Sequence, residues 1–235
     1  MDLGASGHTL EQIDAWLTGL LTGASLPVAL AIACLLGLRH ATDPDHMVAV
    51  TALVAGDRSG RHDAMRLGAW WGVGHAATLL SAGIPLTLLE SQPPAWLERG
   101  AETAIGLVMV LLAARVLVRW LRGAYRMRPV PDDAPTRERP HVRSPREALA
   151  IGVLHGVAGT GAVVVLLIAA LPSPAEATMA LLLFAPMTVL SMVLCTGGFA
   201  WSFTRPAVAP FANAVLIPAL GAFGLFFGAW YAGLL

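Results

Sequence analysis

Four side chains able to bind a metal ion or a proton lie within the seven-residue stretch HATDPDH, residues 40–46. Imidazole nitrogen and carboxylate oxygen are ligands for borderline divalent metals such as nickel, cobalt and zinc. The stretch lies between the apolar runs LPVALAIACLLGLR and MVAVTALVAG. An aspartate at the centre of a membrane helix costs about 2.5–3.5 kcal/mol, so such residues are retained where a partner or a function requires them. We therefore predict a metal site formed by His40, Asp43, Asp45 and His46.

A structural alternative explains part of this stretch without a metal ion. Arg39 and Asp43 are four residues apart and can form an ion pair, and Asp43 also suits the N-cap of a helix that begins at Pro44. This alternative leaves the other three polar side chains of the stretch unexplained. A purely structural polar network remains the competing interpretation of the cluster.

Two further histidines are candidates for the same metal site. His75 lies inside the apolar stretch WWGVGHAATLL, where a hydrogen-bonded core histidine is the alternative. His155 lies in the glycine-rich stretch LHGVAGTGA. We expect this stretch to break the helix of the second half as Pro44 breaks the first, although close helix packing by small residues is an alternative.

The composition is that of an integral membrane protein. Of 235 residues, 56% are hydrophobic and 13% are charged, whereas soluble domains carry about 25% charged residues. The net charge is zero and no lysine is present, so a nucleic-acid partner is not expected and a P-loop for ATP hydrolysis is excluded. Tryptophans, Trp71 among them, are expected in interfacial belts. Helical apolar segments are predicted at roughly 25–56, 67–89, 101–121, 147–171, 177–203 and 207–234.

The placement of arginine predicts six crossings with both termini outside. The loops at 57–66 and 122–146 are arginine-rich and should be cytoplasmic, whereas the 90–100 loop is net acidic and should face outside. This topology allows the segment 25–56 only one crossing. As a single helix it would run about 48 Å, beyond the ~30 Å hydrocarbon core. A helix broken at Pro44, with the motif at the joint, resolves the conflict.

The two halves of the chain resemble a faint inverted repeat. Aligning His40 with His155 also aligns Gly37 with Gly152. Three crossings in each half give the halves opposite topology, as in secondary transporters that bind substrate near the midplane. The predicted parts are an external tail or interfacial helix at 1–24, a three-helix repeat at 25–122, a cytoplasmic linker at 123–146 and a second three-helix repeat at 147–235.

The stretch RHATDPDH fits His-x4-Asp-His and resembles the signature of the nickel/cobalt transporter family. In that family the motif lies in a membrane helix and is required for metal transport, which implies roles for His40, Asp45 and His46, with Asp43 as an extra acid. WWGVGHAATLL, with His75, is similar to a second block of the family. The family's Asp-Thr-Ala-Thr-Glu block is absent, and both the DPDH spelling and LHGVAGTGA resemble the shorter UreH-type members.

These observations predict an all-α multi-pass protein of the bacterial inner membrane that acts as a secondary transporter, not as an enzyme. The cargo would be a divalent transition metal, nickel or cobalt, with the lipid bilayer as the other partner and no permanently bound cofactor. The sequence leaves open a homo-oligomer and metal-handling partner proteins. Two alternative functions are an intramembrane metalloenzyme, disfavoured because no His-Glu-x-x-His occurs, and a transporter of another cargo with the cluster as a proton relay.

Overall fold

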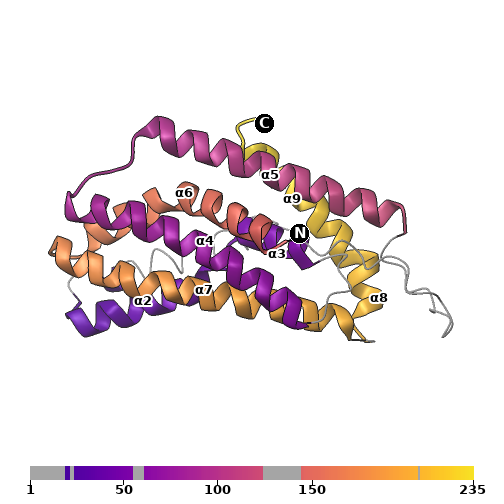
Figure 1. Ribbon diagram of the computed structural model, residues 1–235, viewed down its shortest axis with the longest axis horizontal. Coiled ribbons are helices and arrows are strands. Elements are labelled where there is room, and N and C mark those ends of the chain that lie inside the picture. Colours follow the sequence, from indigo (N-terminus) through magenta and orange to yellow (C-terminus); the bar gives the residue numbers. More distant parts are fainter. Residues whose placement is uncertain (1–18, 22–23, 55–60, 124–143, 206) are drawn as a thin grey trace.

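Helices make up the fold, and no strand occurs in the ranges that the computed structural model describes: 19–21, 24–54, 61–123, 144–205 and 207–235 (Figure 1). This confirms the all-α prediction. The predicted tail at 1–24 and linker at 123–146 fall almost wholly outside these ranges. The helices are α2 (Leu26–His40), α3 (Pro44–Val54), α4 (Arg61–Leu88), α5 (Ala95–Leu121), α6 (Pro145–Ala170), α7 (Pro174–Thr204), α8 (Ala209–Phe211), the π-helical η1 (Ala212–Leu216) and α9 (Ile217–Tyr231).

The two long helices of the second half begin with the same local signal, Ser-Pro-x-Glu. Ser144 caps α6 by accepting a hydrogen bond from the backbone N–H of Glu147. Ser173 caps α7 by accepting from the N–H of Glu176. Proline suits the first position of a helix because the N–H that it lacks would have no partner there. The acidic residue in the first turn also interacts favourably with the helix dipole.

Four helical stretches of the described chain are long and apolar enough to cross a membrane. They are α5, α6, the Pro174–Ser202 part of α7 and the Ala209–Tyr231 run from α8 to α9. Helix α4 has 28 residues but carries more polar side chains, and α2 and α3 are shorter. Large apolar side chains such as Leu111, Leu194 and Phe226 are exposed, as expected for surfaces that face lipid. The chain is thus a polytopic membrane protein, and six crossings remain a prediction.

The predicted topology can be tested by cysteine labelling in a background that lacks Cys34 and Cys195. Cysteine introduced at Ser59 or at Ala134, in the two predicted cytoplasmic loops, should react with an impermeant reagent only after the cells are permeabilised. A matched control at Ser91, in the predicted outer loop, should react in intact cells. Ready labelling of position 59 or 134 from outside would overturn both the six crossings and the inverted repeat.

The main helix pairs, though not the α3·α5 pair, map onto one another when the two halves are exchanged. The exchange takes α2 and α3 to α6, α4 to α7 and α5 to α9. The contact of α2 with α7 then corresponds to that of α6 with α4, and the contact of α3 with α9 corresponds to that of α6 with α5. The pairs α4·α7 and α5·α9 each map onto themselves. Gly37 permits the first close approach, against the Phe184 carbonyl of α7, and Gly152 permits the second, against the Trp71 carbonyl of α4. This pairing supports the inverted repeat, which stays a prediction.

Helix α6 corrects one expectation, because it runs unbroken through the glycine-rich stretch around His155. No proline follows Pro145 within the helix, so every later residue retains the N–H that the helix needs. Gly152 and Gly156 serve close packing instead. A Cβ at Gly152 would overlap the Trp71 carbonyl oxygen, and a Cβ at Gly156 would lie 2.7 Å from the His75 carbonyl oxygen. The backbones of α4 and α6 therefore touch at the level of the candidate histidines.

Candidate metal centre

The site is built around the break between α2 and α3. Helix α2 ends at His40 and α3 begins at Pro44, as the sequence predicts. The chain turns tightly between them, with the N–H of Thr42 donating to the Arg39 carbonyl at 2.8 Å and the N–H of Asp43 donating to the His40 carbonyl at 3.2 Å. The break thereby places HATDPDH at the meeting point of two helix ends.

A side chain of α7 stabilises this break from the opposite half of the molecule. The hydroxyl of Ser191 donates to the carbonyl oxygen of Leu38, in the last turn of α2. Carbonyl groups near a helix end lack partners within the helix, and an unpaired one is costly where water is excluded. Ser191, which is buried, supplies that partner and fixes the end of α2 against α7.

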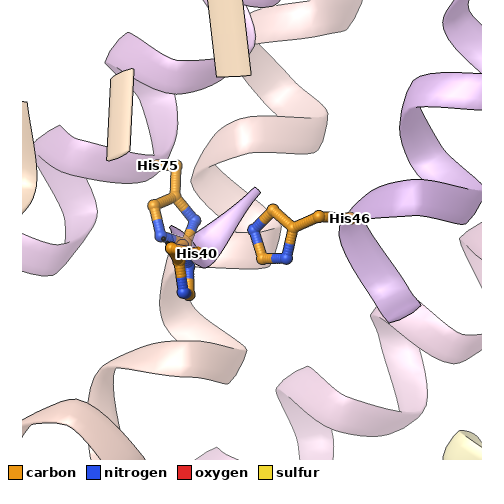
Figure 2. Close-up of side chains that lie close together, drawn as sticks. All are labelled: His40, His46 and His75. Atoms are coloured by element: carbon orange, nitrogen blue, oxygen red, sulfur yellow. Dashed lines mark hydrogen bonds between the residues drawn. The ribbon is translucent and has the colours of Figure 1, made fainter. Parts of the chain in front are cut away.

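The fold brings all six candidate side chains together. His75 reaches the cluster from α4 and His155 from α6, so residues far apart in the sequence meet at the break. Figure 2 shows the rings of His40, His46 and His75 close to one another. His46, His75 and His155 are each at most 2% exposed, which sets them apart from ordinary surface histidines.

Short polar contacts connect the cluster. His40 Nε2 and His75 Nε2 are 3.1 Å apart. Asp45 lies between two imidazoles, with its Oδ1 3.0 Å from His46 Nδ1 and its Oδ2 2.9 Å from His155 Nε2. Asp43 completes the set at the edge, where its Oδ2 is 3.4 Å from His40 Nδ1. The ion pair expected from the sequence is also present, with Arg39 Nη2 3.1 Å from Asp43 Oδ1.

Two overlapping groups of three could hold a metal ion. One consists of His40, His46 and His75, and the other of Asp45, His46 and His155. In each group the ligand atoms lie within 4.8 Å of one another. The nitrogens and carboxylate oxygens available suit borderline divalent ions. His46 belongs to both groups and is therefore the centre of the cluster.

Three ring nitrogens of the cluster are buried without a hydrogen-bond partner among the described atoms. They are His46 Nε2, His75 Nδ1 and His155 Nδ1. Buried polar atoms are nearly always paired, so an unpaired one calls for an explanation such as an ion that the protein binds. The cluster therefore holds polar atoms whose hydrogen-bonding capacity the described residues leave unused.

Two aromatic side chains that pack against the cluster were not predicted from the sequence. Trp71, expected at the membrane interface, is fully buried, with its ring centre 5.4 Å from that of His46 and 5.8 Å from that of His155. Phe184 of α7 lies 5.4 Å from the ring of His40. Trp71 occupies the face of α4 that packs on α6, one turn before His75. Trp71 and His75 are four residues apart, which places them on one face of the helix, and this spacing could have indicated that Trp71 lies beside the cluster.

Comparisons with known proteins find relatives whose names concern urease and nickel. The chain is 28% identical over 184 residues to the "Urease accessory protein UreH" of Bacillus sp. (strain TB-90), covering 76% of this chain and 78% of that protein. It is 33% identical over 125 residues to the "High-affinity nickel transport protein" of Cupriavidus necator, covering 49% of this chain and 35% of that longer protein. No family model matches the chain, and no solved structure does.

These similarities support a relationship to the nickel/cobalt transporters and their UreH-type relatives. This confirms the resemblance drawn from RHATDPDH. The names of both relatives describe transport or accessory proteins, which supports the prediction that this chain is not an enzyme. Together with the four long apolar helices, they support a multi-pass protein of the bacterial cell membrane.

Proposed function

We propose that this protein is a secondary transporter of a divalent transition-metal ion, nickel or cobalt, which it binds in the cluster at the α2–α3 break. The observation that carries the proposal is the convergence of four imidazoles and the Asp45 carboxylate from α2, α3, α4 and α6 on one cluster, with Asp43 of the turn at its edge. Support also comes from the relative named for high-affinity nickel transport.

The chemistry of the cluster suits a borderline ion better than a hard one. Imidazole binds nickel, cobalt and zinc well, whereas magnesium and calcium prefer sites made of oxygen. An ion entering the cluster must lose water, and the imidazole nitrogens of His40, His46 and His75 offer replacement ligands.

One other function has a specific observation in its favour. The hydrogen-bonded series His155–Asp45–His46 resembles a proton relay, as a transporter of another cargo would use. An intramembrane metalloenzyme could use the same ligands around a bound water, but nothing in the site favours it over transport. These alternatives differ in whether the metal itself crosses the membrane.

Uptake by purified protein in liposomes separates the three functions. We expect saturable accumulation of Ni²⁺ or Co²⁺ inside the vesicles, with no accumulation by empty liposomes or in the presence of a chelator outside. A protein that binds Ni²⁺ or Co²⁺ tightly without moving it would point to the metalloenzyme. Proton movement that is independent of both ions would point to the relay and would overturn the proposed function.

A further inference from the structure

The two aspartates of HATDPDH occupy equivalent positions behind two histidines. Asp45 Oδ1 lies 3.0 Å from Nδ1 of His46. Asp43 Oδ2 lies 3.4 Å from Nδ1 of His40. In both pairs the carboxylate faces Nδ1, the ring nitrogen bonded to Cγ. The more distant ring nitrogen, Nε2, is directed away from the carboxylate.

This arrangement determines which nitrogen can bind a metal. An ionised carboxylate only accepts hydrogen bonds, so a neutral imidazole beside it is favoured in the tautomer that carries the proton on the facing Nδ1. The Nε2 atoms of His40 and His46 then hold the lone pairs that a metal needs. A carboxylate behind a ligating histidine is the usual outer-shell arrangement that fixes the tautomer and raises the basicity of the ring.

Both carboxylates are also held from their far side. Arg39 Nη2 lies 3.1 Å from the other oxygen of Asp43. His155 Nε2 lies 2.9 Å from the other oxygen of Asp45 and must donate to it, because the carboxylate only accepts. Asp45 thus has both oxygens hydrogen-bonded, whereas Asp43 is held by Arg39 at one oxygen and lies 3.4 Å from His40 Nδ1 at the other. Both carboxylates are thereby fixed beside the rings and are poorly available as direct ligands.

The free Nε2 atoms converge with His75. The distance between the Nε2 atoms of His40 and His75 is 3.1 Å. Two nitrogens about 2.1 Å from one metal ion lie roughly 3.0–3.4 Å apart, so this spacing suits two ligands of the same ion. His46 Nε2 is buried without a partner among the described residues, and Figure 2 shows a ring nitrogen of His46 directed toward the other two rings.

We infer that the ion is bound by the Nε2 atoms of His40, His46 and His75, while Asp43 and Asp45 are positioning residues that orient two of these imidazoles from behind. The inference rests on the proposed function and deepens it. His75 Nε2 now donates to His40 Nε2, so ion binding requires the proton of His75 to leave Nε2, and the unpartnered Nδ1 of His75 can receive it. His155 stands behind Asp45, outside the set of ligands.

Paired substitutions of Asp45 distinguish a positioning carboxylate from a ligating one. Asparagine keeps an oxygen that accepts from His46 Nδ1–H, and its amide can donate to His155 once that ring takes its other tautomer. We expect Asp45→Asn to weaken Ni²⁺ binding by at most about 10-fold and Asp45→Ala by about 100-fold. Binding is measured by titration calorimetry on solubilised protein with intact melting behaviour. Asp43→Asn and Asp43→Ala should show the same order with smaller losses.

Infrared difference spectra of Ni²⁺ binding give an independent reading. A ligating carboxylate changes its stretching bands, and such a change would disappear in Asp45→Asn. We expect Asp45→Asn to retain the wild-type metal-induced bands and His75→Ala to lose about 100-fold or more in affinity. The inference would be overturned if Asp45→Asn and Asp45→Ala lost equal Ni²⁺ affinity and a metal-induced carboxylate band of the wild type were missing in Asp45→Asn. That result would not count against the proposed transport function. Wild-type affinity in His75→Ala would also overturn it. Absence of Ni²⁺ or Co²⁺ uptake by the wild-type protein would instead reject the proposed function.

Discussion

Metal uptake should fall by about 100-fold or more when His46 is replaced by alanine, while the protein should remain inserted and folded. His46 belongs to both groups of three that could hold a metal, and its ring is 2% exposed. The substitution removes a ligand and also removes the donor that holds Asp45, and losing an outer-shell contact alone commonly costs 10–100-fold in affinity. The measurement is Ni²⁺ or Co²⁺ uptake into proteoliposomes at several ion concentrations.

A histidine outside the cluster provides the control for this prediction. His62 is exposed in the first turn of α4, so His62→Ala should transport as the wild type does. Melting temperatures of both variants in detergent show whether a loss of uptake reflects unfolding. Normal uptake by His46→Ala would mean that the cluster is not the transport site.

Replacement of Gly152 by alanine should destabilise the protein and lower uptake together with stability. A Cβ at this position overlaps the backbone carbonyl of Trp71 and would lie 3.0 Å from the backbone nitrogen of His75. Backbone atoms of two packed helices cannot move aside locally, so α4 and α6 must separate. Overpacking of this kind costs about 1–3 kcal/mol or more. Separation of the helices would also move His155 away from its contact with Asp45.

Two other glycines test whether close packing is the cause. A Cβ at Gly198, on α7, would meet nothing within 4 Å. A Cβ at Gly159, on the same helix as Gly152, would meet only His75 Cε1, at 3.8 Å. Alanine at either position should therefore leave the melting temperature near that of the wild type. If the melting temperature of Gly152→Ala equals that of these two variants, the contact between α4 and α6 does not depend on this glycine.

The local features of the site could be predicted from the sequence because single residues determine them. Pro44 lacks an N–H and ends the helical hydrogen-bond pattern, so the break lies where the sequence places it. The alignment of His40 with His155 was also informative. Gly37 and Gly152 both lie at close helix contacts, and both histidines belong to one cluster.

Features that depend on how helices face one another could not be predicted in the same way. The glycines near His155 can loosen a helix or permit close packing, and only the position of α4 decides for packing. Trp71 has the character of an interfacial residue, yet the same contact buries it. Asp43 and Asp45 look alike in sequence as metal ligands. Their distances to Nδ1 atoms, which depend on side-chain rotation, are what suggest a different role.

The ion pair between Arg39 and Asp43 has a consequence for the electrostatic cost of holding a divalent cation inside a membrane. Among the described residues of the cluster, Arg39 cancels the charge of Asp43, which leaves the single negative charge of Asp45 when the imidazoles are neutral. A bound divalent cation changes this to a single positive charge. Because the self-energy of a charge in a medium of low dielectric constant depends on its square, the empty and loaded clusters bear similar costs. If the cluster carries a divalent ion as proposed, ion exchange need not pass through a doubly charged state, and discrimination between ions would rest on their preference for nitrogen ligands.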